Sequence, residues 1–430
     1  MRVSYSEIFN WVNHDALLMM TSHSLRNFSR NLLTVLMAIY LDEIGFSLIQ
    51  IGAFISAGIM GSALYTVLVA FFADLAGRRL ILVVLTLLRA TVGLSLVITD
   101  NAPFLILLSF FGAHSTGGAG GAGVLSLELA SLAATVPSQR RTQLFALYSI
   151  AGTTAAAVGA LAAGLPDLYG PLFDLTKVES LRIALIAYSA VLILAAISSG
   201  MLSSAVEAGG IEQRWSNPLR LPSRGRILSL SGLFAIDHFA EGLIVQSLVS
   251  LWFFTQFQVS ISSLGLLFSL SQLAATVSAL LATQLAKRFG LINTMVLTHF
   301  QSNVLLFLLP FLPTFWMALI CWLGFSLLAR MSEPLRQSYS MGIVDPSERV
   351  AMATANTLGR SSSSSLAPSL STALWSASLF SLPFFSSSIL KMFHDVALYL
   401  TYRNVRPPEE KNRITPSNEY IQPNVETNKP

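Results

Sequence analysis

The sequence predicts an all-α integral membrane protein with twelve transmembrane helices in two pseudo-symmetric six-helix bundles. Three observations support this fold class. The 430 residues are 53% hydrophobic and only 11% charged, whereas soluble domains carry about 25% charged residues. The apolar runs are continuous, which disfavours strands, and they are long enough for helices of about 20 residues that cross a bilayer. The first half of the chain also recurs in the second half.

The twelve crossings are expected on apolar stretches that short polar turns separate. Their predicted ranges are residues 14–41, 48–73, 79–99, 103–128, 141–165, 181–200, 227–254, 263–286, 291–311, 313–332, 350–372 and 375–401. The run Ser361–Ser365 lies within the eleventh crossing. We expect it to stay helical, because a serine hydroxyl can bond to a carbonyl of its own helix.

Composition divides the chain into four parts. Residues 1–200 are expected to form the N-terminal bundle and residues 227–402 the C-terminal bundle. Residues 201–226 are polar, contain four arginines and form the predicted cytoplasmic linker. Residues 403–430 are rich in proline and polar residues, so we expect a disordered cytoplasmic tail.

An internal repeat links the two bundles. Shifting the sequence by 213 residues superposes residues of the same type: Ser47 on Ser260, Gly52 on Gly265 and Gly77 on Gly290. The shift is close to half of the chain. Membrane proteins built from such repeats place their binding site where the repeats meet.

The basic residues predict the orientation. With the N-terminus inside the cell, the external loops receive only Lys177 and Arg182, and the other flanking cations fall inside. We therefore predict a multi-pass protein of the cell (plasma or inner) membrane with both termini cytoplasmic. The net charge of +4 follows from this topology, and no basic face is suited to nucleic acid. The lipid bilayer is the expected surrounding partner.

Several kinds of chemistry are disfavoured. Cys321 is the only cysteine and lies in the tenth crossing, so no disulfide within the chain and no thiolate metal site is expected. The sequence has no Ser/His/Asp set, no His-rich cluster and no Gly-x-x-x-x-Gly-Lys-Ser/Thr phosphate loop. We predict a monomer that is not an enzyme and binds no cofactor or metal.

A charged turn joins the second and third crossings. It resembles the loop signature of the major facilitator superfamily, Gly-x-x-x-Asp-Arg-x-Gly-Arg-Arg/Lys. Asp74, Gly77, Arg78 and Arg79 stand in register, whereas Leu75 replaces the first arginine. The resemblance extends over about residues 14–402 through the number of crossings, the orientation, the linker and the repeat. It implies a secondary transporter that exposes a central site alternately to the two sides of the membrane.

The resemblance also implies a cytoplasmic gate. In this family the loop acid and its arginines latch the two halves together, which assigns this role to Asp74, Arg78 and Arg79 around Gly77. Glu128 and the Glu333–Arg336 segment are expected near cytoplasmic helix ends and are added to the gate. The alternative is that these residues only cap helices and fix the topology.

The fourth crossing carries a weaker resemblance to drug/proton antiporters of the family. Their pattern Arg-x-x-Gln-Gly-x-Gly-x-Ala is similar to residues 114–122, where His114 replaces the arginine. A histidine can change its charge near neutral pH, so His114 is a candidate for proton coupling. The overlapping Gly-x-Gly-x-x-Gly run lies inside an apolar crossing, where it favours helix packing over dinucleotide binding.

Ionisable residues at membrane depth are costly and are therefore candidate functional residues. Arg26 and Arg30 stand at i, i+4 on the first crossing, and Asp237 and Glu241 stand at i, i+4 on the seventh. The resemblance places these two crossings on opposite walls of a central cavity. The arginines would attract an anionic or polar substrate group, and Asp237 or Glu241 would take up a proton. The alternative is a static ion pair that joins the two halves.

Three further polar residues lie within crossings. Arg360 is expected on the wall of a wet cavity, where it contacts substrate or pairs with an acid. His299 and Lys391 are interpreted as solitary polar groups near a helix surface or end.

These observations predict secondary active transport of a small molecule by alternating access, with proton-coupled efflux (antiport) as the favoured mode. One alternative is uptake or exchange of an organic anion that Arg26 and Arg30 attract. A second is a membrane sensor or scaffold on the same fold. Small-molecule substrate and protons are the expected partners.

Overall fold

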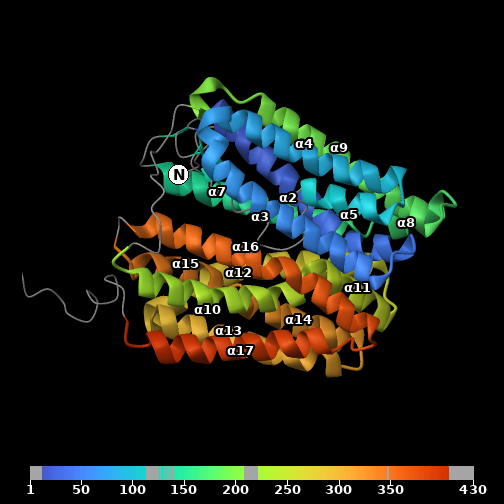
Figure 1. Ribbon diagram of the computed structural model, residues 1–430. Coiled ribbons are helices and arrows are strands. Elements are labelled where there is room, and N and C mark those ends of the chain that lie inside the picture. Colours follow the sequence, from blue (N-terminus) through green and yellow to red (C-terminus); the bar gives the residue numbers. More distant parts are fainter. Residues whose placement is uncertain are drawn as a thin grey trace, which may run out of the picture.

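The computed structural model describes residues 12–112, 125, 127–129, 131, 132, 135, 136, 140–207, 221–345 and 348–405. Within these residues the secondary structure is helical, and the helices form two bundles that lie side by side (Figure 1). The N-terminal bundle contains α2 (His14–Glu43), α3 (Leu48–Ala76), α4 (Arg78–Ile98), α5 (Ala102–Phe111), α7 (Arg141–Ala162), α8 (Pro166–Leu172), α9 (Lys177–Gly200) and the 3-10 turn η3 (Ser204–Val206). The C-terminal bundle contains α10 (Arg224–Leu243), α11 (Gln246–Phe257), α12 (Ile261–Phe289), α13 (Leu291–Leu308), η5 (Leu309–Phe311), α14 (Phe315–Ala329), α15 (Ser332–Gly342), α16 (Arg349–Ser376) and α17 (Leu382–Tyr402).

The predicted all-helical membrane fold is confirmed. Each of the twelve predicted crossings contains a described helix, and eight helical segments of the described residues are long and apolar enough to cross a membrane. Two helical stretches are interrupted. The chain leaves the helix at Ile244 and Val245 between α10 and α11, inside the seventh predicted crossing, and at Arg330 and Met331 between α14 and α15, at the end of the tenth. The sequence analysis did not predict these breaks, although Gly242 and Pro334 lie close to them.

The serine run of the eleventh crossing is helical, as predicted. It lies in the middle of α16, which spans 28 residues. Ser363 Oγ donates to the Gly359 carbonyl at 2.7 Å, and Ser364 Oγ donates to the Arg360 carbonyl at 2.8 Å. These bonds return to the helix's own backbone, so the hydroxyls need no partner from lipid.

The sequence repeat corresponds to repeated geometry. Helices α3 and α12 both have 29 residues. Ser47 caps α3 by accepting a hydrogen bond from the Gln50 amide, and Ser260 caps α12 by accepting one from the Ser263 amide. The helices end at Gly77 and Gly290, with φ values of 89° and 86°. This backbone conformation favours glycine, which explains why the same residue recurs in both halves.

The first glycine of each repeat lies where the two bundles touch. A Cβ added to Gly52 on α3 would overlap Thr372 Oγ1 on α16. A Cβ added to Gly265 on α12 would lie 2.8 Å from the Ala160 carbonyl oxygen on α7. Small residues let helices approach closely in a membrane. Both copies of the repeat therefore have glycine where a helix of one bundle packs against a helix of the other. Figure 1 shows α3 and α16 side by side.

Hydrogen bonds join the bundles on the same side. We name this side the closed end; it carries the loops at residues 44–47, 173–176 and 258–260. Ser250 Oγ of α11 donates to the Val35 carbonyl at 2.8 Å. The Ser262 amide of α12 donates to Asp167 Oδ2 at 2.7 Å, and the Ser369 and Ser56 hydroxyls lie 2.8 Å apart. In the predicted orientation this end faces the outside of the cell.

Replacing Gly52 by valine is expected to open the closed end. The added side chain overpacks the contact with α16, and such overpacking costs about 1–3 kcal/mol. Cysteine labelling would report this opening. The native Cys321 is first replaced by serine, and Ser250→Cys then introduces a single thiol at a position whose native side chain is fully buried. A membrane-impermeant maleimide should label this thiol about tenfold faster when Gly52→Val is present.

Gly232→Val is the matched control, because a Cβ at Gly232 on α10 meets no atom within 4 Å. This control should leave the labelling rate unchanged. An unchanged rate in Gly52→Val as well would contradict the assignment of Gly52 to the contact that closes this end.

Candidate functional site

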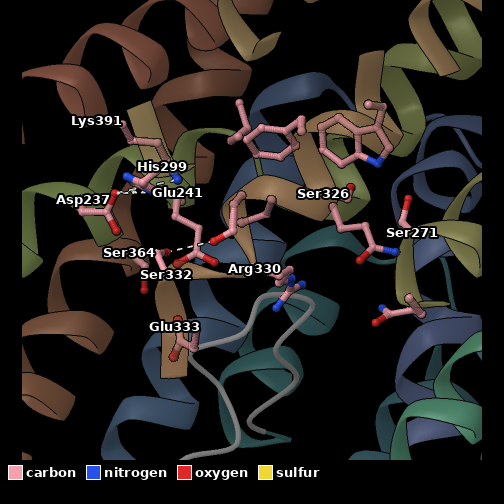
Figure 2. A pocket seen from close by; sticks show the side chains of 18 of the residues that line it. Asp237, Glu241, Ser271, His299, Ser326, Arg330, Ser332, Glu333, Ser364 and Lys391 are labelled. Carbon is pink, nitrogen blue, oxygen red and sulfur yellow. Dashed lines mark hydrogen bonds and ion pairs between the residues drawn. The ribbon is translucent and has the colours of Figure 1, made fainter. Parts of the chain in front are cut away.

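A cavity of about 150 Å³ lies between the bundles at mid-depth, and Figure 2 shows its lining. The C-terminal bundle supplies nearly all of the wall, and Ile59 of α3 contributes from the other bundle. One part of the wall is aromatic and consists of Phe268, Trp322 and Phe325. A second part carries amides and hydroxyls, from Gln246, Ser271, Gln272 and Ser326. A third part is charged and contains Asp237, Glu241, Arg330, Glu333, Arg336 and Lys391.

Asp237 is the centre of a buried ion-pair network. Its side chain on α10 is 3% exposed. Asp237 Oδ2 accepts a hydrogen bond from Arg336 NH1 at 2.8 Å, and Oδ1 lies 3.9 Å from Lys391 Nζ. Two cations from α15 and α17 therefore neutralise this carboxylate, and their attraction offsets the free energy of removing the charge from water.

The network continues through two histidines. His299 Nε2 on α13 lies 3.6 Å from Asp237 Oδ1, and His299 Nδ1 lies 2.7 Å from Asp395 Oδ1. Asp395 also contacts His394 Nδ1 at 3.1 Å and accepts a hydrogen bond from the Asn303 amide at 3.0 Å. Four helices of the C-terminal bundle thus share one buried polar network.

Three groups of this network could offer ligand atoms to a metal ion. The nearest donor atoms of Asp237, His299 and His394 all lie within 4.8 Å of one another, and all three side chains are buried. However, Arg336 and Lys391 already lie next to Asp237. Their positive charges oppose a further cation, so we interpret the cluster as an ion-pair network.

A second, more open charge group lies one turn along α10. Glu241 is four residues from Asp237 and therefore on the same face of the helix. Arg360 of α16 donates to Glu333 Oε1 at 3.0 Å and lies 3.8 Å from Glu241 Oε2. The side chains of Glu241 and Glu333 are 41% and 40% exposed, so both carboxylates face the cavity. His238 Nδ1 lies 3.1 Å from Glu241 Oε2.

Gly242 explains how α10 and α16 bring these charges together. A Cβ at Gly242 would lie 2.9 Å from the Ser364 carbonyl oxygen and 2.7 Å from the Ala367 side chain. The missing side chain lets the two helices pack closely. Arg360, one turn before Ser364, consequently reaches the carboxylate that precedes Gly242.

The N-terminal bundle holds a separate charge cluster. Arg26 is 7% exposed and forms an ion pair with Glu128. Glu128 also accepts a hydrogen bond from the Tyr148 hydroxyl at 2.5 Å, and His23 Nδ1 lies 3.3 Å from it. Arg26 NH1 donates further to Ser22 Oγ at 2.8 Å. This cluster is buried among helices of one bundle.

These positions correct the expected arrangement of opposed charged walls. Arg26 does not face Asp237 or Glu241, because Glu128 holds it inside its own bundle. The acids of α10 pair with Arg336 and Arg360 of their own bundle. The alternative of a static ion pair between the halves is also corrected. Every ion pair among the described residues joins two side chains of the same bundle.

Arg30 is placed differently from Arg26, although the two share one helix face. The residue is exposed, and its side chain donates from NH2 to Asn27 Oδ1 at 2.7 Å. One of the two predicted arginines is therefore buried and paired with an acid, whereas the other is exposed and has no acidic partner among the described residues.

The predicted gate has a simpler structure than expected. Glu207, just after η3, accepts hydrogen bonds from the Arg78 amide at 2.7 Å and the Arg79 amide at 3.1 Å. A carboxylate thus caps the N-terminus of α4, where it is favoured by the helix dipole. Gly77 leaves room for it, because a Cβ there would lie 3.2 Å from Glu207 Oε1. Helix capping therefore occurs here, by a residue that the sequence analysis missed, and the latch role of Arg78 and Arg79 stays a prediction.

Two predicted gate and coupling residues lie outside the described part. The side chain of Asp74 and the whole of His114 are not among the described residues, so their roles stay predictions. Glu128 lies in the buried cluster with Arg26, and Glu333 and Arg336 line the central cavity. A gate role for these residues stays a prediction.

Sequence reasoning also missed several members of the networks. His299 and Lys391 are not solitary, since both contact Asp237. A signal was available for Lys391 and Asp395, which stand at i, i+4 within an apolar stretch. Arg330 gave no such signal, because it lies at the unpredicted break between α14 and α15.

Asp237→Asn is expected to destabilise the C-terminal bundle strongly. The change leaves the buried Arg336 and Lys391 without their carboxylate, and breaking a buried pair in this way costs about 3–5 kcal/mol. The thermal unfolding of purified protein in detergent should therefore shift to a clearly lower temperature. The double variant Asp237→Asn with Arg336→Gln should recover part of the loss, because it removes one uncompensated cation.

The control is Asp100→Asn, which removes an exposed ion pair with Arg182. Such pairs contribute about 0–1 kcal/mol. If Asp237→Asn lowered the unfolding temperature no more than this control does, the interpretation of the network as a structural charge balance would be wrong.

Comparisons with known proteins support the fold and the class of function. The sequence pattern of the Major Facilitator Superfamily matches residues 19–207 and 230–425. A relative from Saccharomyces cerevisiae (strain ATCC 204508 / S288c), "Uncharacterized membrane protein YJR124C", is 23% identical over 334 residues, which cover 70% of this chain and 74% of the relative.

Solved transporters share the arrangement of helices. The nucleoside transporter NupG matches with a TM-score of 0.70 and 16% identity, over 91% of this chain and 99% of the other. A bacterial homologue of the iron transporter ferroportin in an inward-facing state matches with a TM-score of 0.72 and 14% identity, over 94% of this chain and 100% of the other. A bacterial homologue of the human lysosomal transporter Spinster, in an inward-facing and occupied conformation, matches with a TM-score of 0.70 and 16% identity, over 94% of this chain and 98% of the other. At these identities the likeness concerns the fold. Because the family pattern covers most of the sequence, the chain belongs to the Major Facilitator Superfamily and is a multi-pass membrane protein that transports a small molecule.

Proposed function

We propose that this transporter couples the movement of its substrate to protons and that Glu241 carries the coupling proton. The single observation behind this proposal is the position of Glu241 in the cavity wall. Its carboxylate is 41% exposed to the cavity, whereas Asp237, one turn away, is 4% exposed and paired. A proton-coupling acid must exchange protons with water, and the exposed Glu241 meets this requirement better than the buried Asp237.

The surroundings of Glu241 give it two alternative partners. Arg360 lies 3.8 Å away and has its shorter contact, 3.0 Å, with Glu333. His238 lies 3.1 Å away on the same helix. When Glu241 is charged, Arg360 is shared between two carboxylates. When Glu241 takes up a proton, Arg360 can pair with Glu333 alone, so protonation need not leave a buried charge without a partner.

The direction of transport follows from the sequence resemblance. We propose efflux by antiport across the cell membrane, with both termini cytoplasmic. The arrangement of the bundles fits this proposal, because their contacts lie at the end predicted to face outward. The cavity would then be reached from the cytoplasm, as required for loading a substrate that is exported.

Exchange or uptake of an organic anion is the second candidate. It is favoured by Arg30, which is exposed between the bundles and has no acidic partner among the described residues. The two candidates share the same cavity and differ in the charge of the substrate and in the direction of its movement.

Glu241→Gln is expected to separate substrate binding from proton movement. Glutamine keeps the shape of the side chain and cannot take up a proton. A thermal-shift screen of purified protein would first find ligands, and proteoliposomes that contain the pH-sensitive dye pyranine would then report ligand-driven proton flux. The variant should still be stabilised by the ligand, and the proton flux should be lost.

Glu43→Gln is the control, because this carboxylate pairs with Lys177 at the closed end and does not line the cavity. It should retain proton flux. Ligand-driven proton flux in Glu241→Gln at the rate of the native protein would refute the assignment. Loss of flux in Asp237→Asn with its stability intact would move the assignment to Asp237.

A further inference from the structure

Arg330 of the C-terminal bundle lines the cavity, and Arg30 of the N-terminal bundle precedes Asn31, which bonds to the cavity wall. Arg30 lies in the middle of α2, and Arg330 lies at the break between α14 and α15. We propose that these two arginines form a clamp for the carboxylate or phosphate group of a small organic anion. This proposal names the substrate class and rests on the proposed function only in taking the cavity as the substrate site.

Arg330 reaches the cavity because the helix is broken at its position. The residue is exposed and lines the cavity wall, as Figure 2 shows. No acidic side chain lies within ion-pair distance of it in the described part of the chain. An arginine at membrane depth without an acidic partner is costly unless it faces water or an anion.

Arg30 is tied to the same region from the other bundle. The residue after it, Asn31, accepts a hydrogen bond from Gln272 Nε2 at 2.6 Å. Gln272 belongs to α12 and lines the cavity together with Arg330. Asn27 Oδ1 holds the Arg30 guanidinium at 2.7 Å, which orients it without neutralising it.

The charges around the cavity favour an anion over a cation. The cavity wall carries three acids, Asp237, Glu241 and Glu333, and three bases, Arg330, Arg336 and Lys391. Arg360 adds a fourth base, because it donates to Glu333 and lies 3.8 Å from Glu241. A bound anion would offset the excess positive charge.

The chemistry of the clamp suggests the shape of its ligand. A guanidinium group binds a carboxylate or phosphate through two parallel hydrogen bonds, so two arginines can hold one such group from both sides. The wall formed by Phe268, Trp322 and Phe325 is apolar and faces the same cavity. We therefore expect an anion with an apolar or aromatic body.

The clamp also links binding to the conformational change. In the absence of an anion the two arginines repel each other, which favours separation of the bundles on the open side. An anion between them replaces this repulsion by attraction to both halves. A ligand shifts a conformational equilibrium only through such a difference in affinity, so the clamp would favour closure when it is loaded.

Binding of four matched probes tests the clamp without a transport assay. Phenylacetate and phenyl phosphate are anions, phenethylamine is a cation and phenethyl alcohol is neutral, and all four carry a phenyl ring. Inorganic phosphate tests the headgroup without the ring. Affinities would be obtained from ligand-dependent thermal shifts of the purified full-length protein. The two anions should stabilise the protein, and the cation and the alcohol should not. The preferred anion distinguishes a carboxylate substrate from a phosphate one.

The variants Arg30→Gln and Arg330→Gln should each bind the preferred anion at least about tenfold more weakly, the size expected for losing a charged hydrogen-bond partner. The double variant should lose the preference for anions. Without ligand, the double variant should be no less stable than the native protein, because both charges it removes lack a counterion. Arg288→Gln is the control, since Arg288 lies in the last turn of α12 and stacks over Phe289.

Two results would overturn the clamp: no preference for anions in the native protein, or an unchanged preference in the double variant. Glu241→Gln separates this outcome from the coupling proposal. Anion binding that persists in this variant while proton flux is lost supports both. Flux that persists in Glu241→Gln refutes the proton site and leaves the clamp standing.

Discussion

The absence of water in the bilayer core is the constraint on which the rest of this structure depends. A charge there must meet an opposite charge, a hydrogen-bond partner or a wet cavity. The protein meets this requirement separately in each half. Arg26 is neutralised by Glu128 in the N-terminal bundle, and Asp237 by Arg336 and Lys391 in the C-terminal bundle. These buried charges are consequently paired within their own bundle.

This separation suits two bodies that rock against each other. An ion pair across the interface would have to break in every cycle, with a buried charge exposed each time. The contacts between the bundles include close glycine packing and hydrogen bonds between neutral groups, as at Gly52, Ser250 and Ser369. One further bond runs from the Ser262 amide to the carboxylate of Asp167. Neutral groups of this kind can exchange a protein partner for water at small cost, because the net gain of one hydrogen bond is about 1 kcal/mol.

The fold could be predicted from the sequence because it depends on local patterns. Apolar length predicted the helices. The 213-residue shift paired Ser47 with Ser260 and Gly77 with Gly290, and the structure shows that these residues begin and end α3 and α12.

The site was predicted only in part. Asp237, Glu241 and Arg360 do line or adjoin the cavity, but their partners were not foreseen. Which side chain pairs with Asp237 depends on the rotation and depth of α15 and α17, and a sequence pattern does not give these. Glu207 caps a helix whose Arg78 lies 129 residues earlier in the chain, and Arg330 lies in a helix break that the apolar pattern does not show. Both positions depend on tertiary packing.

The repeat is kept in the framework of the two halves and lost in their charges. The capping serines, the packing glycines and the helix lengths correspond, whereas the positions 213 residues after Arg26 and Arg30 are Phe239 and Leu243. The C-terminal bundle carries the acids and bases that line the cavity, whereas the N-terminal bundle pairs Arg26 with Glu128 and leaves Arg30 exposed. The repeated framework suits the rocking motion, since both bundles must turn and pack against each other in the same way. The asymmetric charges make the two walls of the cavity different, and only such a difference lets an identical pair of scaffolds select one kind of substrate.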